Sequence, residues 1–266
     1  MSQDAPHDSK RKLRILGVPV SVVSLGTASR EVVRGASAEK PFVVFVRDAP
    51  SLMRVVEEPR LRQLHEIADL VVPDGMPLVW AGRLRGYEGI GRVAGADLVE
   101  SVCAITENTG LSHFFYGGRD GVAAKMATEL IKKFPGLKVA GTIAPPMMEI
   151  GPNFSLDERG RSDIEVLRSS GADFVWVGLS SPKQEYWIAE AITCCDRAVF
   201  LGVGAAFDFH SGTVQRAPLW MQRTGLEWFH RLFSDPARLW RRYLLLAPRF
   251  AFAAAVEVVR SNMSRS

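Results

Sequence analysis

The sequence is poor in cysteine and has no long hydrophobic run, and both absences narrow its class. Its three cysteines, two of them adjacent, have neither the number nor the spacing of a disulfide framework or a CxxC metal site. No run reaches the roughly 18 apolar residues of a membrane-spanning helix, because the nearest candidate, 243–256, is interrupted by Pro248 and Arg249. The first 14 residues are polar and charged, which predicts a disordered lead-in rather than a signal peptide or anchor. We therefore expect a soluble or peripheral protein of a reducing compartment.

Lysine is absent from the last 52 residues, although arginine is abundant there. From Gln215 onward the chain has nine arginines and three acids, a net charge of +6. Residues 1–214 carry 24 basic and 26 acidic side chains, a net charge of −2. The overall charge of +4 hides this division, which indicates that the C-terminal segment binds something anionic.

Short apolar runs rich in branched side chains alternate with longer helical patterns along the chain, as is typical of parallel βαβ units. Strands are predicted at 42–46, 68–72, 112–116, 137–141, 174–178 and 198–201. We expect an α/β fold with a Rossmann-like, mostly parallel sheet and helices on both faces. Residues 1–14 would be the lead-in and residues 15–214 the α/β domain. Residues 215–266 would form a basic helical appendage, here called the tail.

Ligands of open parallel sheets bind at the carboxyl ends of the strands, so residues that follow strands are the candidates. Gly117 and Gly118 follow one strand and would let backbone N–H groups approach a phosphate, although a plain strand-to-helix turn explains them equally well. Their spacing is neither GxGxxG nor that of a P-loop, which disfavours both of those nucleotide sites.

Another strand ends at Gly178 and leads into a helix start. The next residues form a helix-start pattern, with Ser181 as the N-cap, Pro182 at the first helical position and Gln184 at the third. The presence of Gln184 therefore needs no ligand to explain it. A cation at the positive end of a helix is unfavourable unless an anion offsets it. Lys183 therefore predicts a bound phosphate or pyrophosphate, weighed against a solvated lysine.

Two aspartates follow strands in apolar surroundings. Asp208, after Gly204, needs a partner if buried, either a ligand hydroxyl or a tail arginine such as Arg216. Asp74, followed by Gly75, could take a proton from an incoming hydroxyl or merely cap a helix. The sequence shows no cluster of metal-ligand spacing beside them, so neither a metal nor a cofactor is implied.

Aromatic residues interleave with the arginines of the C-terminal segment, three tryptophans among them. This pattern suits an interfacial helix, because indole prefers the headgroup level and guanidinium binds phosphate. Two alternatives stay open: a nucleic-acid surface, which we disfavour, and helices that dock their Trp and Leu faces on the sheet with the arginines solvated.

Taken in order, these segments resemble the WecG/TagA/CpsF family of glycosyltransferases, which makes bacterial cell-surface polysaccharides. The resemblance covers about residues 16–249, and its most specific part is the ordered set PKQE, GVGxxFD, RAP and GLEW. The matching segments are GVP at 17–19, PDGM at 73–76, RVAGADL at 92–98, FYGG at 115–118, PKQE at 182–185, GVGAAFD at 202–208, RAP at 216–218 and GLEW at 225–228 with Arg231.

The resemblance implies inverting, metal-independent transfer of a sugar from a UDP-sugar to an undecaprenyl-diphosphate-linked acceptor. It also implies a cytoplasmic enzyme held peripherally at the inner face of the membrane, with homo-oligomerisation left open. Asp74 occupies the position of the family's general base. The tail arginines expected to clamp the acceptor diphosphate are Arg216, Arg231, Arg238 and Arg241. The residues expected to bind the nucleotide sugar are Asp48, Gly75, Arg92, Gly95, Asp97, Gly117, Gly118, Gly178, Lys183, Gln184, Glu185, Gly204 and Asp208.

One segment departs from the family pattern. Where the family usually has Thr-x-Asn, this chain has Val46-Arg47-Asp48. Asp48 would keep part of the hydrogen bonding but add a negative charge, which favours a neutral hexose or N-acetylhexosamine over a uronic acid. The same departure motivates a rival function, an inactive UDP-sugar-binding subunit. Another rival, an epimerase-like enzyme with a soluble substrate, would not need the basic tail.

Overall fold

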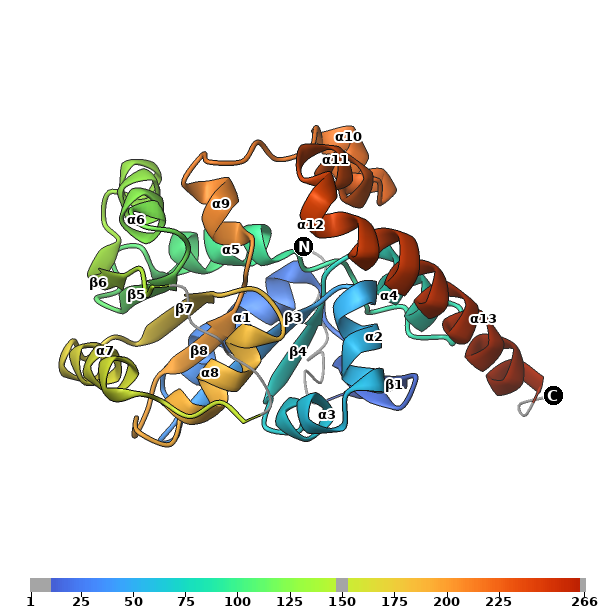
Figure 1. The fold of residues 1–266 in the computed structure, drawn as a ribbon, viewed down its shortest axis with the longest axis horizontal. Helices are drawn as coiled ribbons and strands as arrows, with labels where there is room; N and C mark the ends of the chain where they lie inside the picture. The colour runs from blue at the N-terminus through green and yellow to red at the C-terminus, as the bar shows by residue number, and fades with distance from the viewer. Residues whose placement is uncertain (1–10, 147–152, 264–266) are drawn as a thin grey trace, which may run out of the picture.

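The fold is built on one six-stranded sheet in which all neighbouring strands run parallel. The computed structural model describes residues 11–146 and 153–263, apart from the side chains of Arg223, Arg238 and Asn262. The strand order is β4-β3-β8-β7-β5-β6 (Figure 1). The strands are β3 (Phe42–Arg47), β4 (Leu70–Pro73), β5 (Ser112–Gly117), β6 (Lys138–Ile143), β7 (Phe174–Gly178) and β8 (Val199–Gly202). The six predicted strands and the Rossmann-like class are confirmed.

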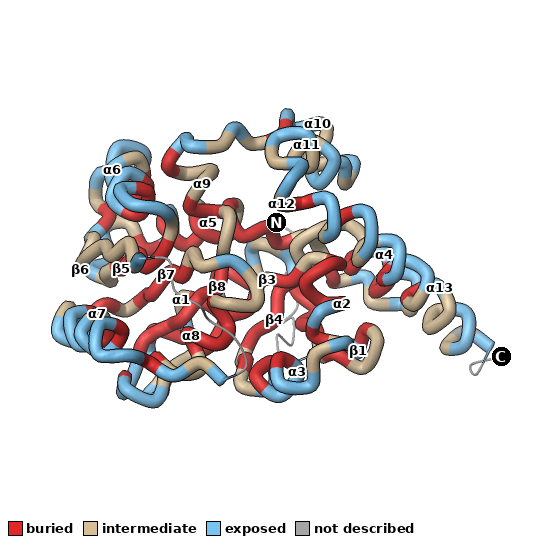
Figure 2. Tube along the Cα trace, viewed as in Figure 1, coloured by how far each residue is buried: buried red, intermediate tan, exposed pale blue. Residues whose placement is uncertain are grey.

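Helices cover both faces of the sheet, because alternate residues of a strand point to opposite sides. Along β3, Val43 and Phe45 join one core and Val44 the other. The first core includes residues of α2 (Ala49–Glu57), α3 (Pro59–His65), α4 (Met76–Arg83), α7 (Glu158–Ser169) and α8 (Lys183–Ala191). The second includes residues of α1 (Leu25–Gly35), α5 (Gly95–Thr106), α6 (Val122–Lys133) and α9 (Ala206–His210). Figure 2 shows the central strands almost wholly buried between these layers.

A separate antiparallel hairpin, which the sequence pattern did not predict, precedes the sheet. β1 (Lys12–Ile15) and β2 (Val18–Ser21) are joined by Leu16 and Gly17, whose φ values are 51° and 76°. Two successive positive φ values are those of a type I′ turn, which Asn-Gly usually signals and Leu-Gly does not. Since β1 begins at Lys12, the expectation that residues 1–14 are a disordered lead-in is wrong for its last residues.

The carboxyl ends of β5 and β7 approach each other closely because glycines stand there. A Cβ at Gly117, whose φ is +130°, would lie 2.7 Å from the carbonyl carbon of Gly178. A Cβ at Gly178 would in turn lie 2.5 Å from the ring of Phe207 in α9. The N–H of Gly118 donates to the Gly178 carbonyl at 3.0 Å. These glycines therefore have a packing role that needs no ligand.

The strand order reverses at β3 and β8, which makes their carboxyl ends the expected ligand crevice. From β3 the chain adds β4 on one side, then crosses to β5 and β6 before returning through β7 to β8 beside β3. At such a switch point the loops leave the sheet in opposite directions and open a crevice between them. The segments beyond residue 215 lie over this edge (Figure 1).

The tail is helical, as predicted, but most of its aromatic surface is exposed. It comprises α10 (Leu219–Thr224), α11 (Glu227–Ser234), α12 (Pro236–Trp240), the π-helical segment η1 (Arg241–Leu246) and α13 (Ala247–Met263). Tyr243 and Phe250 are buried, whereas Trp220, Trp228 and Trp240 keep 60, 37 and 43% of their surface exposed. The alternative in which the tryptophan faces dock on the sheet is therefore wrong. No helix within the described ranges combines the length and apolarity needed to cross a bilayer.

Two ion pairs join the tail to the start and end of α2. Arg242 of η1 contacts the carboxylate of Asp48 at 2.6 Å, and both side chains are largely buried. Arg249 of α13 contacts Glu57 at 2.8 Å, but the Arg249 side chain is 61% exposed. Because exposed pairs are screened by water, the first pair should contribute far more to docking of the tail.

We expect Gly117→Ala to destabilise the protein by at least about 2 kcal/mol, because the added methyl group meets backbone and the left-handed conformation disfavours it. Urea unfolding followed by circular dichroism measures this change. Gly26→Ala is the matched control, since Gly26 is helical and the new methyl group meets nothing closer than 3.6 Å. An equal effect of the two substitutions would contradict the packing role of Gly117.

Arg242→Gln should loosen the tail, because it leaves the Asp48 carboxylate without its charged partner. The expected loss of unfolding free energy is about 1.5–3 kcal/mol, with faster amide hydrogen exchange in η1 and α12. Arg249→Gln, which removes the exposed pair of the same tail, should cost less than about 1 kcal/mol. Unchanged exchange in Arg242→Gln would show that Asp48 does not anchor the tail.

Candidate active site

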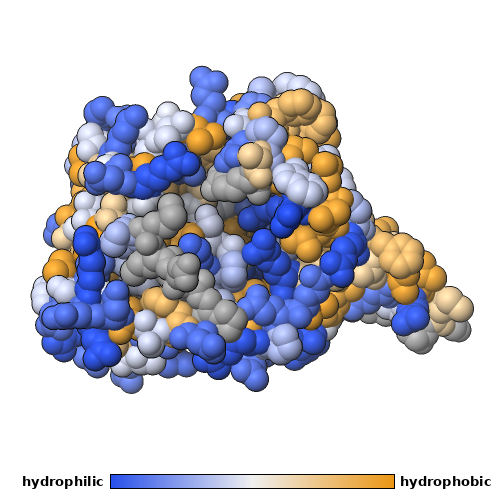
Figure 3. Space-filling model, in the orientation of Figure 1, coloured by the Kyte–Doolittle hydropathy of each residue, from blue (hydrophilic) through white to orange (hydrophobic). Residues whose placement is uncertain are grey.

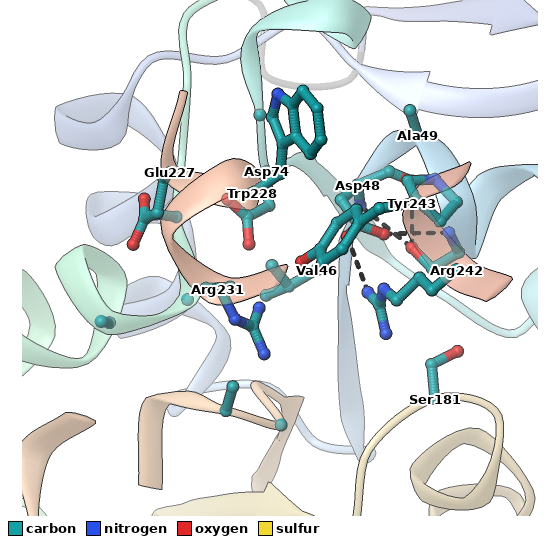
Figure 4. A pocket seen from close by; sticks show the side chains of 18 of the residues that line it. Val46, Asp48, Ala49, Asp74, Ser181, Glu227, Trp228, Arg231, Arg242 and Tyr243 are labelled. Carbon is teal, nitrogen blue, oxygen red and sulfur yellow. Dashed lines mark hydrogen bonds and ion pairs between the residues drawn. The ribbon is translucent and has the colours of Figure 1, made fainter. Parts of the chain in front are cut away.

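A pocket of about 390 Å³ lies at the switch point, between the carboxyl edge of the sheet and the tail. Its floor comes from the turns after β3, β4 and β8 and from the loop before α5. The other wall comes from α10, α11, η1 and the start of α13. Figure 4 shows Asp74, Glu227 and Arg231 around this space, with Tyr243 between them and the pair of Asp48 and Arg242. The tail therefore completes a pocket that the α/β domain alone leaves open.

Asp74 stands at the centre of the floor, immediately after β4. Its N–H donates to the carbonyl of Arg47 at 2.6 Å, which ties the turn to the neighbouring strand. Gly75 then adopts a φ of +114° and lets α4 begin at Met76, so the Asp74 side chain points out of the turn into the pocket. Two of the predicted residues, Asp74 and Gly75, are thus at the pocket.

Burial raises the pKa of Asp74 to about 6, above its ordinary value of 3.8. The Arg92 guanidinium opposes this rise, with its Nε atom 3.9 Å from a carboxylate oxygen of Asp74. The negative charges of Asp48 and Glu227 raise the pKa further. A carboxylate with this pKa is ionised at neutral pH and is a stronger base than a solvated aspartate.

A chain of ion pairs crosses the pocket from the α/β domain to the tail. Arg92 contacts Asp74 and Glu227, and it donates to the carbonyl of Gln222 at 3.3 Å. Arg216 contacts the other oxygen of Glu227 at 3.2 Å and pairs with Asp97 of α5. The predicted residues Arg92, Asp97 and Arg216 therefore lie together, but they bind one another through Glu227. Glu227 was not among the predicted site residues.

Asp48 lines the pocket, with both carboxylate oxygens engaged. One oxygen accepts the N–H of Ser51 at 2.9 Å and so caps α2, while the other contacts Arg242 at 2.6 Å. Burial would raise the pKa of Asp48, but the Arg242 guanidinium and the Ser51 bonds bring it below its ordinary value. The negative charge of Asp48 is thus largely compensated by Arg242, a tail arginine that was not among the predicted site residues.

Gln184 and Glu185 are neighbours in α8 with different surroundings. Gln184 lines the pocket, is only 3% exposed, and packs so closely on Gly202 that a Cβ there would lie 2.9 Å from its amide nitrogen. Glu185 lies beneath the pocket, fully buried against Arg47, which also donates to the Ser181 hydroxyl at 3.2 Å. Glu185 therefore supports the floor of the pocket and does not line it.

The predicted helix start at Ser181 is wrong. α8 begins at Lys183, its N-cap is Pro182 after a cis peptide bond, and no side chain caps it. The Ser181 hydroxyl instead contacts the buried Arg47 guanidinium. Lys183 is partly buried and does not line the pocket, so its contact with an anion stays a prediction.

The remaining predicted residues divide between the pocket and its surroundings. Gly95 and Gly204 line the pocket, and Gly95 packs against the backbone of the loop that follows β8. Gly117, Gly118, Gly178 and Asp208 do not line it, and the glycines have the packing role described above. The proposed pair of Asp208 with Arg216 is not formed, since Arg216 binds Asp97 and Glu227.

The tail arginines are not equivalent. Arg231 lines the pocket and lies over the Phe209 ring at 5.6 Å, and it has no carboxylate within ion-pair distance among the residues described. Arg241 instead stacks on Trp240 at 5.2 Å, away from the pocket lining. The side chain of Arg238 lies outside the described residues. Arg231 thus offers the pocket a cation for an anionic ligand.

The acidic side chains of the described part of the site face arginines rather than one another. Across residues 11–146 and 153–263, no three His, Cys, Asp or Glu side chains gather as metal ligands do. Asp48, Asp74, Asp97 and Glu227 face arginines, which compensate their charge.

The sequence is similar to known proteins over most of its length. The family model described as glycosyl transferase WecG/TagA/CpsF family matches residues 13–264. A relative from Bacillus spizizenii named N-acetylglucosaminyldiphosphoundecaprenol N-acetyl-beta-D-mannosaminyltransferase is 33% identical over 198 residues, 74% of this chain and 72% of the relative. A relative of the same name from Bacillus subtilis is 30% identical over 190 residues, covering 71% of this chain and 70% of its own. The chain therefore belongs to the WecG/TagA/CpsF family of glycosyl transferases.

Proposed function

We propose that the protein transfers a neutral hexose or N-acetylhexosamine from a UDP-sugar to an acceptor linked to a polyprenyl diphosphate. The observation that carries this proposal is a carboxylate of raised pKa, Asp74, in a pocket that also presents the guanidinium of Arg231, which has no carboxylate within ion-pair distance in the described part of the chain. The names of the two relatives describe transfer of N-acetylmannosamine to an N-acetylglucosaminyl diphosphoundecaprenol, which supports the same class of acceptor.

Asp74 is the general base in this proposal. It accepts the proton of the acceptor hydroxyl while the hydroxyl oxygen forms a bond to the anomeric carbon of the donor. The bond between that carbon and the diphosphate oxygen breaks on the opposite side, and UDP leaves with the electron pair. One bond forms as one breaks, so the configuration at the anomeric carbon inverts.

Cationic groups on two sides of the pocket hold the two diphosphates. Arg231 binds the acceptor diphosphate from the tail, because a guanidinium forms paired, charge-assisted hydrogen bonds with phosphate oxygens. The nucleotide passes Gly204, which lines the pocket, and extends along the carboxyl edge of the sheet toward Lys183. There the lysine and the start of α8 offset the charge that develops on departing UDP.

The sugar is expected to be uncharged because two carboxylates of the pocket floor face the space that it would occupy. Asp48 and Asp74 both face the space where the sugar would sit, and the Asp48 carboxylate is ionised. A uronic acid would bring a third carboxylate beside them, which Coulomb repulsion disfavours. Neutral hydroxyl or acetamido groups could donate to the same oxygens.

The tail supplies a surface suited to the membrane in which such an acceptor resides. On the face seen in Figure 3, hydrophobic residues gather over the tail and along α13. The exposed large apolar residues of the tail include Trp220, Phe229, Phe233, Trp240, Leu244, Leu245 and Phe252. Aromatic side chains beside arginines favour the headgroup layer. We therefore expect peripheral association with the inner face of the cell membrane.

A panel of UDP-sugars tested against a polyprenyl-diphosphate-linked N-acetylglucosamine in liposomes examines the whole proposal. Transfer of one neutral sugar, dependent on the lipid acceptor, is the expected result. Binding of UDP-sugars with no transfer to any acceptor would favour an inactive binding subunit. Chemical change of a UDP-sugar without an acceptor would favour an epimerase-like enzyme instead.

Asp74→Asn should lower kcat by roughly 10²–10⁴, the range of a positioned base, without loss of folding. Because only the ionised carboxylate accepts the proton, wild-type activity should fall as the pH drops through about 6. The transfer rate measured from pH 4.5 to 8 checks both statements. Asp120→Asn, an exposed aspartate outside the pocket, is the matched control. Full activity of Asp74→Asn would refute the base assignment.

Arg231→Gln should raise the KM for the lipid acceptor by roughly tenfold or more, as loss of a charged hydrogen bond predicts. Arg241→Gln should have a smaller effect, because its guanidinium stacks on Trp240 outside the pocket lining. Steady-state kinetics with varied acceptor separates KM from kcat. Equal effects of the two substitutions would mean that Arg231 has no special role in binding the acceptor.

A further inference from the structure

The tail contributes a carboxylate to the pocket as well as arginines. Glu227 is the first residue of α11, and only 14% of its side chain is exposed. One of its oxygens contacts Arg92 and the other contacts Arg216 at 3.2 Å. Because Arg216 is itself paired with Asp97 of α5, the Glu227 carboxylate is held from the side of the α/β domain.

Arg92 is oriented mainly by the tail, although it lies in the α/β domain. One terminal nitrogen contacts Glu227 and the other donates to the carbonyl of Gln222 at 3.3 Å. Its Nε atom faces Asp74 at 3.9 Å, which is beyond hydrogen-bond distance. Two groups of the tail thus hold a cation near the carboxylate of Asp74 without a direct hydrogen bond to it.

This separation matters for the chemistry of Asp74. A guanidinium that forms a close, bidentate pair with a carboxylate stabilises its ionised form and makes it a weaker base. Arg92 is within reach of such a pair, and Glu227 competes with Asp74 for the same guanidinium. If Glu227 were absent, Arg92 would be free to turn toward Asp74.

We propose that Glu227 is a positioning residue for transfer: by engaging Arg92 from the tail, it leaves the Asp74 carboxylate free to accept a proton once the tail covers the pocket. Docking of the tail thereby places around Asp74 the groups that keep it basic. Glu227 is then the residue through which the segment that binds the acceptor contacts the surroundings of Asp74. This inference rests on the proposed role of Asp74 as the base.

Among the described residues, the other charged or titratable groups that face Asp74 belong to four elements, and the replacement of Glu227 leaves their identities unchanged. They are Asp48 after β3, Arg92 before α5, Arg231 of α11, and Arg242 and Tyr243 of η1. The negative charge of Glu227, like that of Asp48, raises the pKa of Asp74, so its removal should lower that pKa.

Carboxyl ¹³C NMR titration of the full chain tests the inference without any turnover, with Asp74→Asn used to assign the signal. In Glu227→Gln the apparent pKa of Asp74 should fall by about one pH unit or more, and kcat at pH 7 should fall roughly tenfold with a smaller change in KM. Glu257→Gln is the matched control, because Glu257 is also a tail carboxylate that contacts an arginine of the α/β domain, Arg85, at 3.4 Å. In Glu257→Gln, Asp74 should titrate as it does in the wild type.

Amide hydrogen exchange shows whether the tail of Glu227→Gln remains docked. If it does, an unchanged pKa of Asp74 overturns the inference. If the tail is released, Glu227→Asp decides, because it keeps the charge: an Asp74 pKa above that of Glu227→Gln supports the inference, and equal values overturn it. Failure of the wild type to transfer any sugar would count against the proposed function instead, since the titration does not depend on activity.

Discussion

The carboxylate of Glu227, held between Arg92 and Arg216, is the contact on which the geometry of the pocket depends. On its other side each arginine faces a carboxylate of the α/β domain. Asp97 forms a close ion pair with Arg216, whereas Asp74 lies 3.9 Å from the Nε atom of Arg92. Removing the central charge would take a carboxylate partner from two partly buried guanidinium groups. The arrangement thus ties the fold of the tail to the surroundings of Asp74.

The same pairing explains where the excess positive charge of the tail goes. Several of its arginines form ion pairs with acids of the α/β domain: Arg216 with Asp97, Arg242 with Asp48, and Arg249 with Glu57. These contacts seat the tail over the carboxyl edge of the sheet. Arg231 remains directed into the pocket without such a partner among the described residues. The charge imbalance of the sequence therefore serves docking of the tail and, in the proposed function, binding of the acceptor diphosphate.

The sheet and the general position of the site could be predicted because they depend on local pattern. Buried parallel strands are short apolar runs, and ligand-binding turns follow them, so Asp74 and Gly204 were found at the strand ends. The hairpin was missed because its turn uses Leu16 and Gly17, which give no common turn signal. Its strands are also only four residues long.

The partners of the charged residues could not be predicted, because they join segments far apart in the chain. Glu185 follows a helix-start pattern, yet its burial is set by Arg47, 138 residues away. Arg242 pairs with Asp48 across 194 positions, and nothing in its local sequence distinguishes it from Arg241. The pattern at Gly117 and Gly118 fitted a phosphate-binding turn and a plain turn equally well, whereas the register of β5 and β7 places Gly117 against Gly178.

A double-mutant cycle tests most directly whether the tail acts on the base. Transfer rates of the wild type, Asp74→Asn, Glu227→Gln and the double variant would be compared under single-turnover conditions with saturating acceptor. If Glu227 acts through Asp74, the double variant should be no slower than Asp74→Asn alone, because the base that Glu227 serves is already gone. Rate losses that multiply in the double variant would show that the two carboxylates act independently and would contradict the account.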